Sequence, residues 1–140
     1  MKNFEDLDIW KKARQLTQQI YRTAKGDKFS RDHAFRDQIQ KAAISVMSNI
    51  AEGFERGGNQ EFIQFLYVAK ASCGEVRSQL YIALDQGYIP EPQSYEMIKS
   101  CRRLSGMIPN MIAYLRRSGM KGEKFSTSKI VEKQLPPQQA

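Results

Sequence analysis

The sequence has few of the residues on which catalytic and metal sites depend. Its 140 residues include one histidine, His33, and two cysteines. One histidine cannot supply the paired Glu-x-x-His motifs of a di-metal helical bundle, and no H-E-x-x-H, glycine-rich phosphate loop or G-x-S-x-G occurs. His33 also lacks an arginine at the spacing used by helical-bundle ribonucleases, since position 28 is Lys28 and Arg31 is too close. We expect no catalytic residue, no cofactor and no enzymatic activity.

The cysteines and the hydrophobic segments exclude further classes of protein. Cys73 and Cys101 are far apart, outside any C-x-x-C pair, and no histidine cluster accompanies them. We therefore predict two buried reduced thiols and no metal site. No hydrophobic run approaches the roughly 20 residues of a membrane-spanning helix, and the first ten residues lack the apolar core of a signal peptide. We expect a cytoplasmic protein that does not associate with a membrane.

Positive charge is concentrated in the last third of the chain. The net charge is +7. Residues 1–96 contain 13 basic and 13 acidic residues, whereas residues 97–140 contain 9 basic and 2 acidic residues. Such an asymmetry suggests an anionic partner. The alternative is a solvated helix face followed by a basic tail.

Four segments have the periodicity of amphipathic helices. They cover about residues 4–25, 31–56, 59–86 and 92–118. The expected N-caps of the first three are Asn3, Ser30 and Asn59, and Gly87 ends the third. Short connections favour antiparallel neighbours, so we predict an all-α, up-down-up-down four-helix bundle in residues 1–118. Residues 119–140 lose the periodicity and are predicted to form a mobile basic tail.

One apolar face of each helix is expected to lie in the core. The predicted core includes Trp10, Ile39, Val46, Ile50, Phe62, Leu66, Val76, Leu80, Leu104 and Ile108. The second helix is rich in alanine and serine between positions 42 and 51, so we predict a central helix that its neighbours approach closely on more than one side. Ser72, Asn49 and the polar residues near them are expected to form hydrogen bonds between helices.

The second and third helices have an additional apolar stripe outside the core face. Its members are Ile44, Met47 and Phe54 on the second helix, and Ile63, Tyr67 and Tyr81 on the third. Because one bundle cannot easily cover this surface, we predict that these residues contribute to self-association. The alternative is that the monomer itself covers them in part.

The fourth helix carries the candidate binding residues. Lys99, Arg102, Arg103, Arg116 and Arg117 fall within an arc of about 140° opposite its apolar side, and Lys121 and Lys124 follow in the tail. Clustered arginine and lysine match the phosphates of nucleic acid and bind the backbone without reading base sequence. These residues are therefore the predicted nucleic-acid-binding site.

Several motifs resemble a known protein family. The residues concerned are Phe4, Asp6, Leu7, Ile9, Trp10 and Ala13; Gln38 to Gly53, which ends in S-N-I-A-E-G; Arg56; Glu61, Phe62, Phe65, Leu66, Ala69, Ser72 and Glu75; Gln79 and Leu80; and Gly87 and Tyr88. With these residues, the sequence resembles the small four-helix-bundle proteins of the 23S rRNA intervening-sequence family from about Phe4 to Leu115.

The resemblance implies a ring-like homopentamer in a family without an established enzymatic activity. Some members are encoded within insertions in bacterial large-subunit ribosomal RNA genes, which favours RNA over DNA as the partner. A related group serves as accessory subunits of the reverse transcriptases in diversity-generating retroelements, where a basic pentameric barrel contacts the polymerase and nucleic acid. The alternative function is thus an adaptor that binds a reverse transcriptase or another acidic partner.

Overall fold

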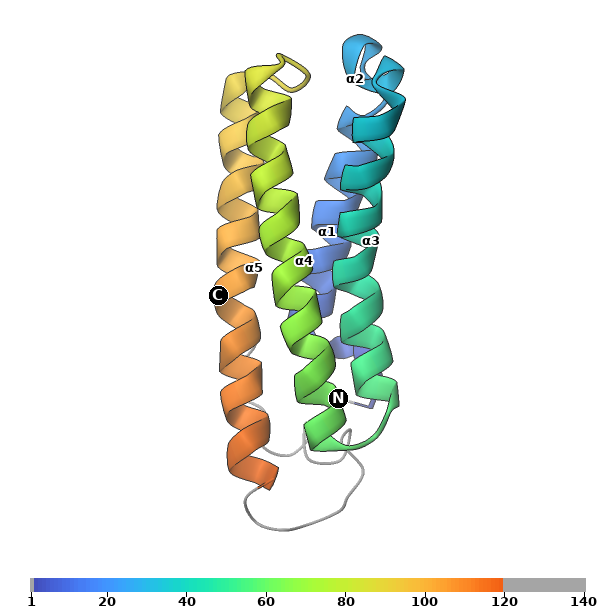
Figure 1. Cartoon of the computed structure of the whole chain (residues 1–140). Coiled ribbons are helices and arrows are strands. Elements are labelled where there is room, and N and C mark those ends of the chain that lie inside the picture. The colour runs from blue at the N-terminus through green and yellow to red at the C-terminus, as the bar shows by residue number, and fades with distance from the viewer. Residues whose placement is uncertain (1, 120–140) are drawn as a thin grey trace.

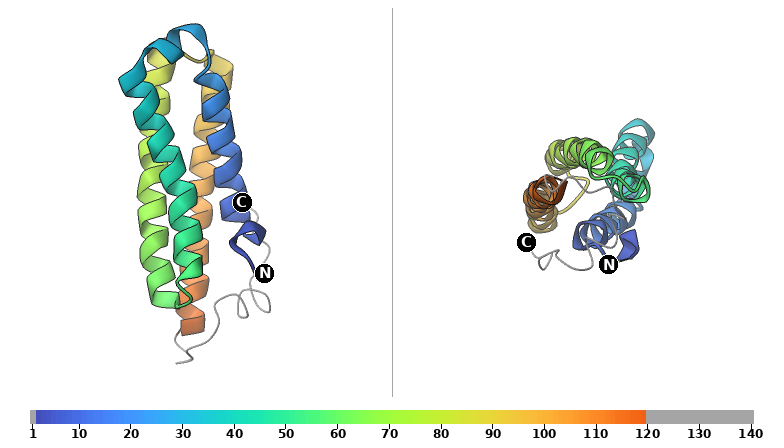
Figure 2. Two further views of the ribbon diagram at one scale, coloured as in Figure 1. Left: turned by 90° about the vertical axis from the view of Figure 1, so that its right-hand side faces the viewer. Right: turned by 90° about the horizontal axis from the view of Figure 1, so that it is seen from below.

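The computed structural model describes residues 2–119, which form an elongated bundle of four long helices (Figures 1 and 2). These are α1 (Asp8–Thr23), α3 (His33–Glu55), α4 (Asn59–Asp85) and α5 (Glu91–Gly119). A 3-10 helix, η1 (Phe4–Asp6), precedes α1, and a short helix, α2 (Asp27–Arg31), joins α1 to α3. The predicted all-α four-helix bundle is confirmed. The tail predicted for residues 119–140 lies, from residue 120 on, outside the described residues.

The helices are arranged so that the first and the last are neighbours. Consecutive long helices run antiparallel, and a view along the bundle shows them at the four corners of a square (Figure 2). α3 packs against α1 and α4, and α5 packs against α4 and α1. α1 and α5 thus lie side by side although about 70 residues separate them along the chain. Charged residues on both helices can share one face.

The start of α3 differs from the prediction. Ser30 lies inside α2, and the N-cap of α3 is Asp32, whose carboxylate accepts a hydrogen bond from the backbone N–H of Phe35 at 3.2 Å. The hydroxyl of Tyr88 donates a second bond to Asp32 at 2.6 Å. The bonds from Tyr88 and Phe35 hold the pKa of Asp32 below its usual value, and the same tyrosine bond raises the pKa of Tyr88. Asp32 is the better cap because two donors converge on it.

The predicted N-cap of α4 was wrong, whereas its predicted end is confirmed. Asn59 is the first helical residue and does not cap the helix, since Gly58 precedes it as N-cap. Its side-chain amide instead donates to the carbonyl of Leu115 at 2.8 Å and ties α4 to the end of α5. Gly87 follows the helix with φ of 71°, a left-handed conformation that favours glycine. The predicted stop at Gly87 is confirmed.

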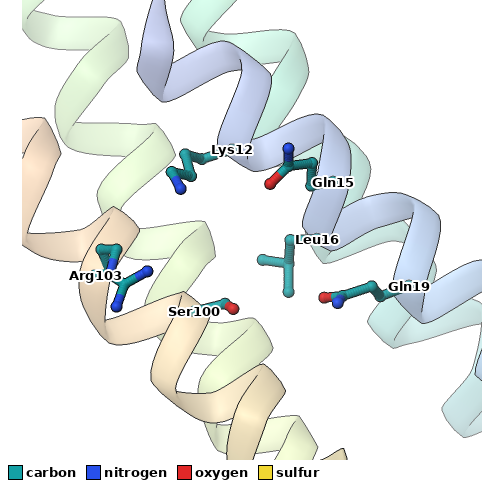
Figure 3. A pocket seen from close by; sticks show the side chains of 6 residues that line it. All are labelled: Lys12, Gln15, Leu16, Gln19, Ser100 and Arg103. Carbon is teal, nitrogen blue, oxygen red and sulfur yellow. The ribbon is translucent and has the colours of Figure 1, made fainter. Parts of the chain in front are cut away.

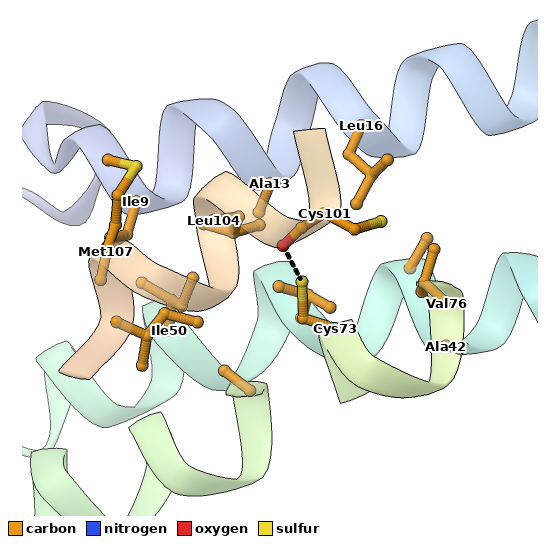
Figure 4. Packing of buried hydrophobic residues seen from close by; sticks show 14 of the residues in the cluster. Ile9, Ala13, Leu16, Ala42, Ile50, Cys73, Val76, Cys101, Leu104 and Met107 are labelled. Carbon is orange, nitrogen blue, oxygen red and sulfur yellow. Dashed lines mark hydrogen bonds between the residues drawn. The ribbon is translucent and has the colours of Figure 1, made fainter. Parts of the chain in front are cut away.

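The hydrophobic core extends along the axis of the bundle (Figure 4). Nine of the ten predicted core residues are at most 1% exposed. Trp10 is the exception, because it is only partly buried at the edge of the core. Its ring packs edge-on against Phe4 at 5.2 Å between centroids, and the guanidinium of Arg14 lies 5.7 Å from it. The single tryptophan therefore covers the outside of the core.

Small residues let α3 and α4 approach closely, as predicted. A Cβ atom placed on Gly53 would lie 2.6 Å from Cβ of Phe65, which is too close for any side chain. The hydroxyls of Ser45 and Ser72 are 2.8 Å apart and join the two helices by a hydrogen bond. α3 also contacts α1, but Ile44 is 44% exposed on its outer side. α3 therefore has two close neighbours and is not enclosed as a central helix.

Candidate nucleic-acid interface

The outer side of α5 carries the five basic residues predicted to bind nucleic acid. All five are exposed: Lys99, Arg102, Arg103, Arg116 and Arg117. The opposite side of the helix is core, where Cys101, Leu104 and Ile108 are at most 1% exposed. No carboxylate occurs in α5 after Glu96, and the positive charges form two groups, one within residues 99–103 and one at Arg116 and Arg117. Lys121 and Lys124, predicted to extend the site, lie outside the described residues.

The two arginines near the end of α5 are placed over tyrosine rings. Arg116 donates a hydrogen bond to the hydroxyl of Tyr67 in α4 at 2.6 Å, and its guanidinium carbon is 5.7 Å from the centre of that ring. The guanidinium of Arg117 lies 6.0 Å from the Tyr114 ring. Burial raises the pKa of Tyr114, so this ring is neutral near pH 7. Stacking on a neutral ring orients an arginine and leaves its charge available.

Arg103 lies at the opposite edge of α5 and faces α1 (Figure 3). Between the two helices is a pocket of about 150 Å³, which is lined by Lys12, Gln15, Leu16, Gln19, Ser100 and Arg103. α1 supplies the first four of these residues and α5 supplies the last two. The predicted basic residues of α5 therefore do not form one row. Arg103 turns toward α1, whereas Arg116 turns toward α4.

α1 contributes basic residues that the sequence reasoning missed. From Ile9 to Lys25, two residues past the end of α1, the chain contains no carboxylate, and its basic residues are Lys11, Lys12, Arg14, Arg22 and Lys25. Lys12 is half-buried and the other four are exposed. The net charge of zero over residues 1–96 concealed this segment, because acidic residues before and after it in the chain offset its charge. A count over single helices would have revealed it.

The ion pairs of the described chain lie away from α1 and α5. Arg56 lies 3.5 Å from the carboxylate of Glu52 and 3.9 Å from that of Glu61, and Arg31 pairs with Asp27 at 2.9 Å. Within residues 2–119, no carboxylate forms an ion pair with a basic residue of α1 or α5. We call the basic surface of these two helices the α1–α5 face. Its residues are Lys11, Lys12, Arg14 and Arg22 of α1, and Lys99, Arg102, Arg103, Arg116 and Arg117 of α5.

The residues predicted to mediate self-association are unequally exposed. Ile44 and Tyr67 are each 44% exposed, and Tyr81 is 39% exposed. Met47 and Ile63 are partly buried against the core. Phe54 is 5% exposed, because its ring packs edge-on against Phe62 inside the bundle at 5.9 Å between centroids.

Two exposed apolar residues of α4 were not among the predicted contacts. Val68 is 48% exposed and Ile82 is 45% exposed. They lie on the same helix as Tyr67 and Tyr81, and the apolar surface on α4 is therefore larger than the sequence pattern indicated.

The residues that could perform chemistry are dispersed or buried. His33 is exposed at the first position of α3. Cys73 and Cys101 are buried free thiols, as predicted, and the thiol of Cys73 donates to the carbonyl of Cys101 at 3.4 Å (Figure 4). The neighbouring Cys73 thiol, together with burial, raises the pKa of Cys101. Across residues 2–119, no group of three histidine, cysteine or acidic side chains could hold a metal ion.

None of the helices within residues 2–119 combines the length and the apolar composition needed to cross a membrane.

Comparisons with known proteins place the chain in a family. Residues 5–110 match the family model described as 23S rRNA-intervening sequence protein. A similar fold occurs in the crystal structure of a protein of unknown function from the S23 ribosomal protein family of Bacteroides thetaiotaomicron, with a TM-score of 0.67 and 18% sequence identity. That match covers 74% of this chain and 97% of the other, and at this identity it shows the fold alone. No curated protein matches the chain. The family match spans most of the bundle, and the chain belongs to the 23S rRNA-intervening sequence protein family.

Proposed function

We propose that this protein is a non-enzymatic, homo-oligomeric scaffold that binds nucleic acid through the α1–α5 face, with RNA preferred to DNA. One observation carries the proposal. α1 and α5 lie side by side, and no carboxylate occurs from Ile9 to Lys25 or from Met97 to Gly119. Phosphates repeat along a nucleic-acid strand, and such a face can contact several of them at once. The preference for RNA rests on the family resemblance.

The side chains on the α1–α5 face suit binding to the backbone of nucleic acid. Arginine and lysine contact phosphate oxygens in any base sequence. α1 exposes the ring of Tyr21 and α5 that of Tyr95, whereas Trp10 and Tyr114 are partly or fully buried. Stacking on an aromatic ring tolerates every base. We therefore expect little discrimination between base sequences.

We further propose that the scaffold is a homopentamer. α4 exposes Tyr67, Val68, Tyr81 and Ile82, and each is between 39% and 48% exposed. Exposed apolar surface of this kind marks sites of protein contact. Ile44 on α3 lies on a different helix, and a contact between two different patches of a subunit closes into a ring when the rotation permits. The number five comes from the family resemblance, and a ring would repeat the α1–α5 face.

A charge-reversal variant tests the nucleic-acid proposal. Lys99, Arg102, Arg103 and Arg117 would be replaced by glutamate, while Arg116 is left unchanged because it bonds to Tyr67. We expect the wild-type protein to bind labelled RNA at low salt in fluorescence anisotropy, and the variant to lose this binding. Circular dichroism and oligomer mass should be unchanged, because all four residues are exposed. Equal binding by the variant, or no binding by the wild type, would contradict the proposal.

A second candidate function is an adaptor that binds a protein such as a reverse transcriptase. The apolar residues exposed on α4 favour it, because they could contact a partner instead of a second copy of this chain. The two functions differ in a mixing experiment. An adaptor would form a complex with a reverse transcriptase at high salt and without nucleic acid, whereas nucleic-acid binding to the α1–α5 face would be lost at high salt.

A further inference from the structure

The pocket between α1 and α5 has a lining suited to an anion (Figure 3). Five of its six lining residues are polar: Lys12, Gln15, Gln19, Ser100 and Arg103. Each of the five can donate a hydrogen bond, and two of them are permanently charged near pH 7. No carboxylate lines the pocket, although Asp8 and Glu96 lie one turn before Lys12 and Ser100 on their helices. The site therefore offers many donors and lacks a strong acceptor of its own.

Lys12 and Arg103 make no polar side-chain interaction within the described part of the chain. Among residues 2–119, neither Lys12 nor Arg103 forms an ion pair or a side-chain hydrogen bond. Lys12 is half-buried and lines the pocket. Two like charges facing one space repel each other, and an anion between them removes this repulsion.

The size and the donor geometry favour a phosphate group. The pocket of about 150 Å³ is roughly ten times the space that one buried water needs on the same measure. An arginine guanidinium donates two parallel hydrogen bonds to phosphate oxygens, and a lysine adds a point charge. The glutamine amides and the serine hydroxyl can satisfy the remaining oxygens without adding charge.

We propose that this pocket binds one phosphate group between Lys12 of α1 and Arg103 of α5, with Gln15, Gln19 and Ser100 as neutral donors. The inference rests on the proposed function and deepens it, because it assigns a phosphate position on a face otherwise described only by its charge. The phosphate belongs either to the backbone of a nucleic acid or to a free ion. In the first case the pocket fixes the register of the strand on the protein.

Matched variants separate this pocket from general charge attraction. The pocket variant replaces Lys12 and Arg103 with glutamine, and the control variant replaces their neighbours Lys11 and Arg102 with glutamine. Both lose the same charge from the same two helices, but Lys11 and Arg102 do not line the pocket. We expect the pocket variant of the full chain to bind labelled RNA at least about tenfold more weakly than the control, because charge-assisted hydrogen bonds are lost. The slope of log K against log salt should also be smaller in magnitude for the pocket variant than for the control variant, by about 0.7, because one phosphate contact is lost.

A second measurement does not depend on nucleic acid. Inorganic phosphate added to the wild-type protein should shift the side-chain amide resonances of Gln15 and Gln19, and an equal ionic strength of chloride should not. Shifts by phosphate without any RNA binding would keep the pocket, identify a free ion as its ligand and contradict the proposed function. Equal weakening of RNA binding in both variants, with no shift by phosphate, would overturn the pocket and leave the α1–α5 face as a general binding surface. Circular dichroism of both variants checks that they are folded.

Discussion

Gly53 has no room for a side chain, so even alanine would disturb the packing of α3 against α4. A Cβ atom there would lie 2.6 Å from Cβ of Phe65 and 3.0 Å from Cδ1 of Phe62. Gly53→Ala should therefore push α3 and α4 apart and lower the free energy of unfolding by about 1 to 3 kcal/mol. Urea denaturation followed by circular dichroism measures the loss.

Gly106 in α5 is the matched control for this substitution. Nothing lies within 4 Å of a Cβ placed on it, and it is exposed within a helix. Gly106→Ala should raise the free energy of unfolding by up to about 1 kcal/mol, because alanine favours the helix. If both substitutions had the same effect, the close approach of α3 and α4 at Gly53 would be refuted.

The bond between Tyr88 and Asp32 predicts a dependence of stability on pH. The folded-state pKa of Asp32 lies below 3.8, the value of an unperturbed aspartate. The bond therefore stabilises the fold above that pH, and the stabilisation is lost as the pH falls through the lower folded-state pKa. Tyr88→Phe removes the donor. We expect wild type to melt above the variant at pH 7, and the difference to shrink at about pH 2. An equal difference at both pH values would contradict this reading of the pair.

At the scale of helices, the sequence predicted the long helices, but it did not predict features that depend on contacts between helices. α3, α4 and α5 each bury one apolar stripe, so periodicity alone was sufficient to predict them. The start of α3 was misplaced at Ser30, because Asp32 gains a bond from Tyr88, a residue 56 positions away. α2 was not predicted, since five residues are too few to show a period.

In the candidate site, too, the local sequence pattern was predictive, and the contacts between helices were not predicted. The cations of α5 were found because they repeat at helical spacing on one element. A charge count over α1 alone would have found its basic residues, but only the closed bundle brings Lys12 beside Arg103. The contact of Arg116 with Tyr67 likewise joins two helices and leaves no local signal. Which cations act together is thus decided by helix packing.

A pair of single reversals tests the contribution of α1. Lys11 is exposed on α1 within the α1–α5 face, and Lys41 is exposed on α3 outside it. We expect Lys11→Glu to weaken RNA binding by a few-fold, the size of an exposed charge contact, and Lys41→Glu to have a smaller effect. Fluorescence anisotropy at one low salt concentration compares them. A stronger effect of Lys41→Glu would exclude α1 from the binding surface.

At the scale of the whole molecule, the apolar surface of α4 predicts an oligomer. The chain has a mass of 16.1 kDa. Light scattering at micromolar concentration should give five times this mass. Val68→Glu combined with Ile82→Glu should give the monomer mass, because charge introduced into an apolar contact must lose its water.

The control for this prediction places glutamate elsewhere on the surface. Gln18→Glu combined with Ala113→Glu adds the same charge at exposed positions of α1 and α5. This variant should keep the oligomer mass. A wild-type protein that scatters as a monomer would refute self-association, and an oligomer that survives both pairs of substitutions would place the contact outside α4.

The salt dependence of RNA binding by the wild-type protein tests the central claim most directly. Each basic residue that neutralises a phosphate releases a counterion, so about five contacts on single-stranded RNA predict a slope of log K against log salt near −3.5. The account predicts tight binding at low salt that weakens with a slope of about this size. Absence of binding at low salt, or binding that does not change with salt, would show that the α1–α5 face does not hold nucleic acid.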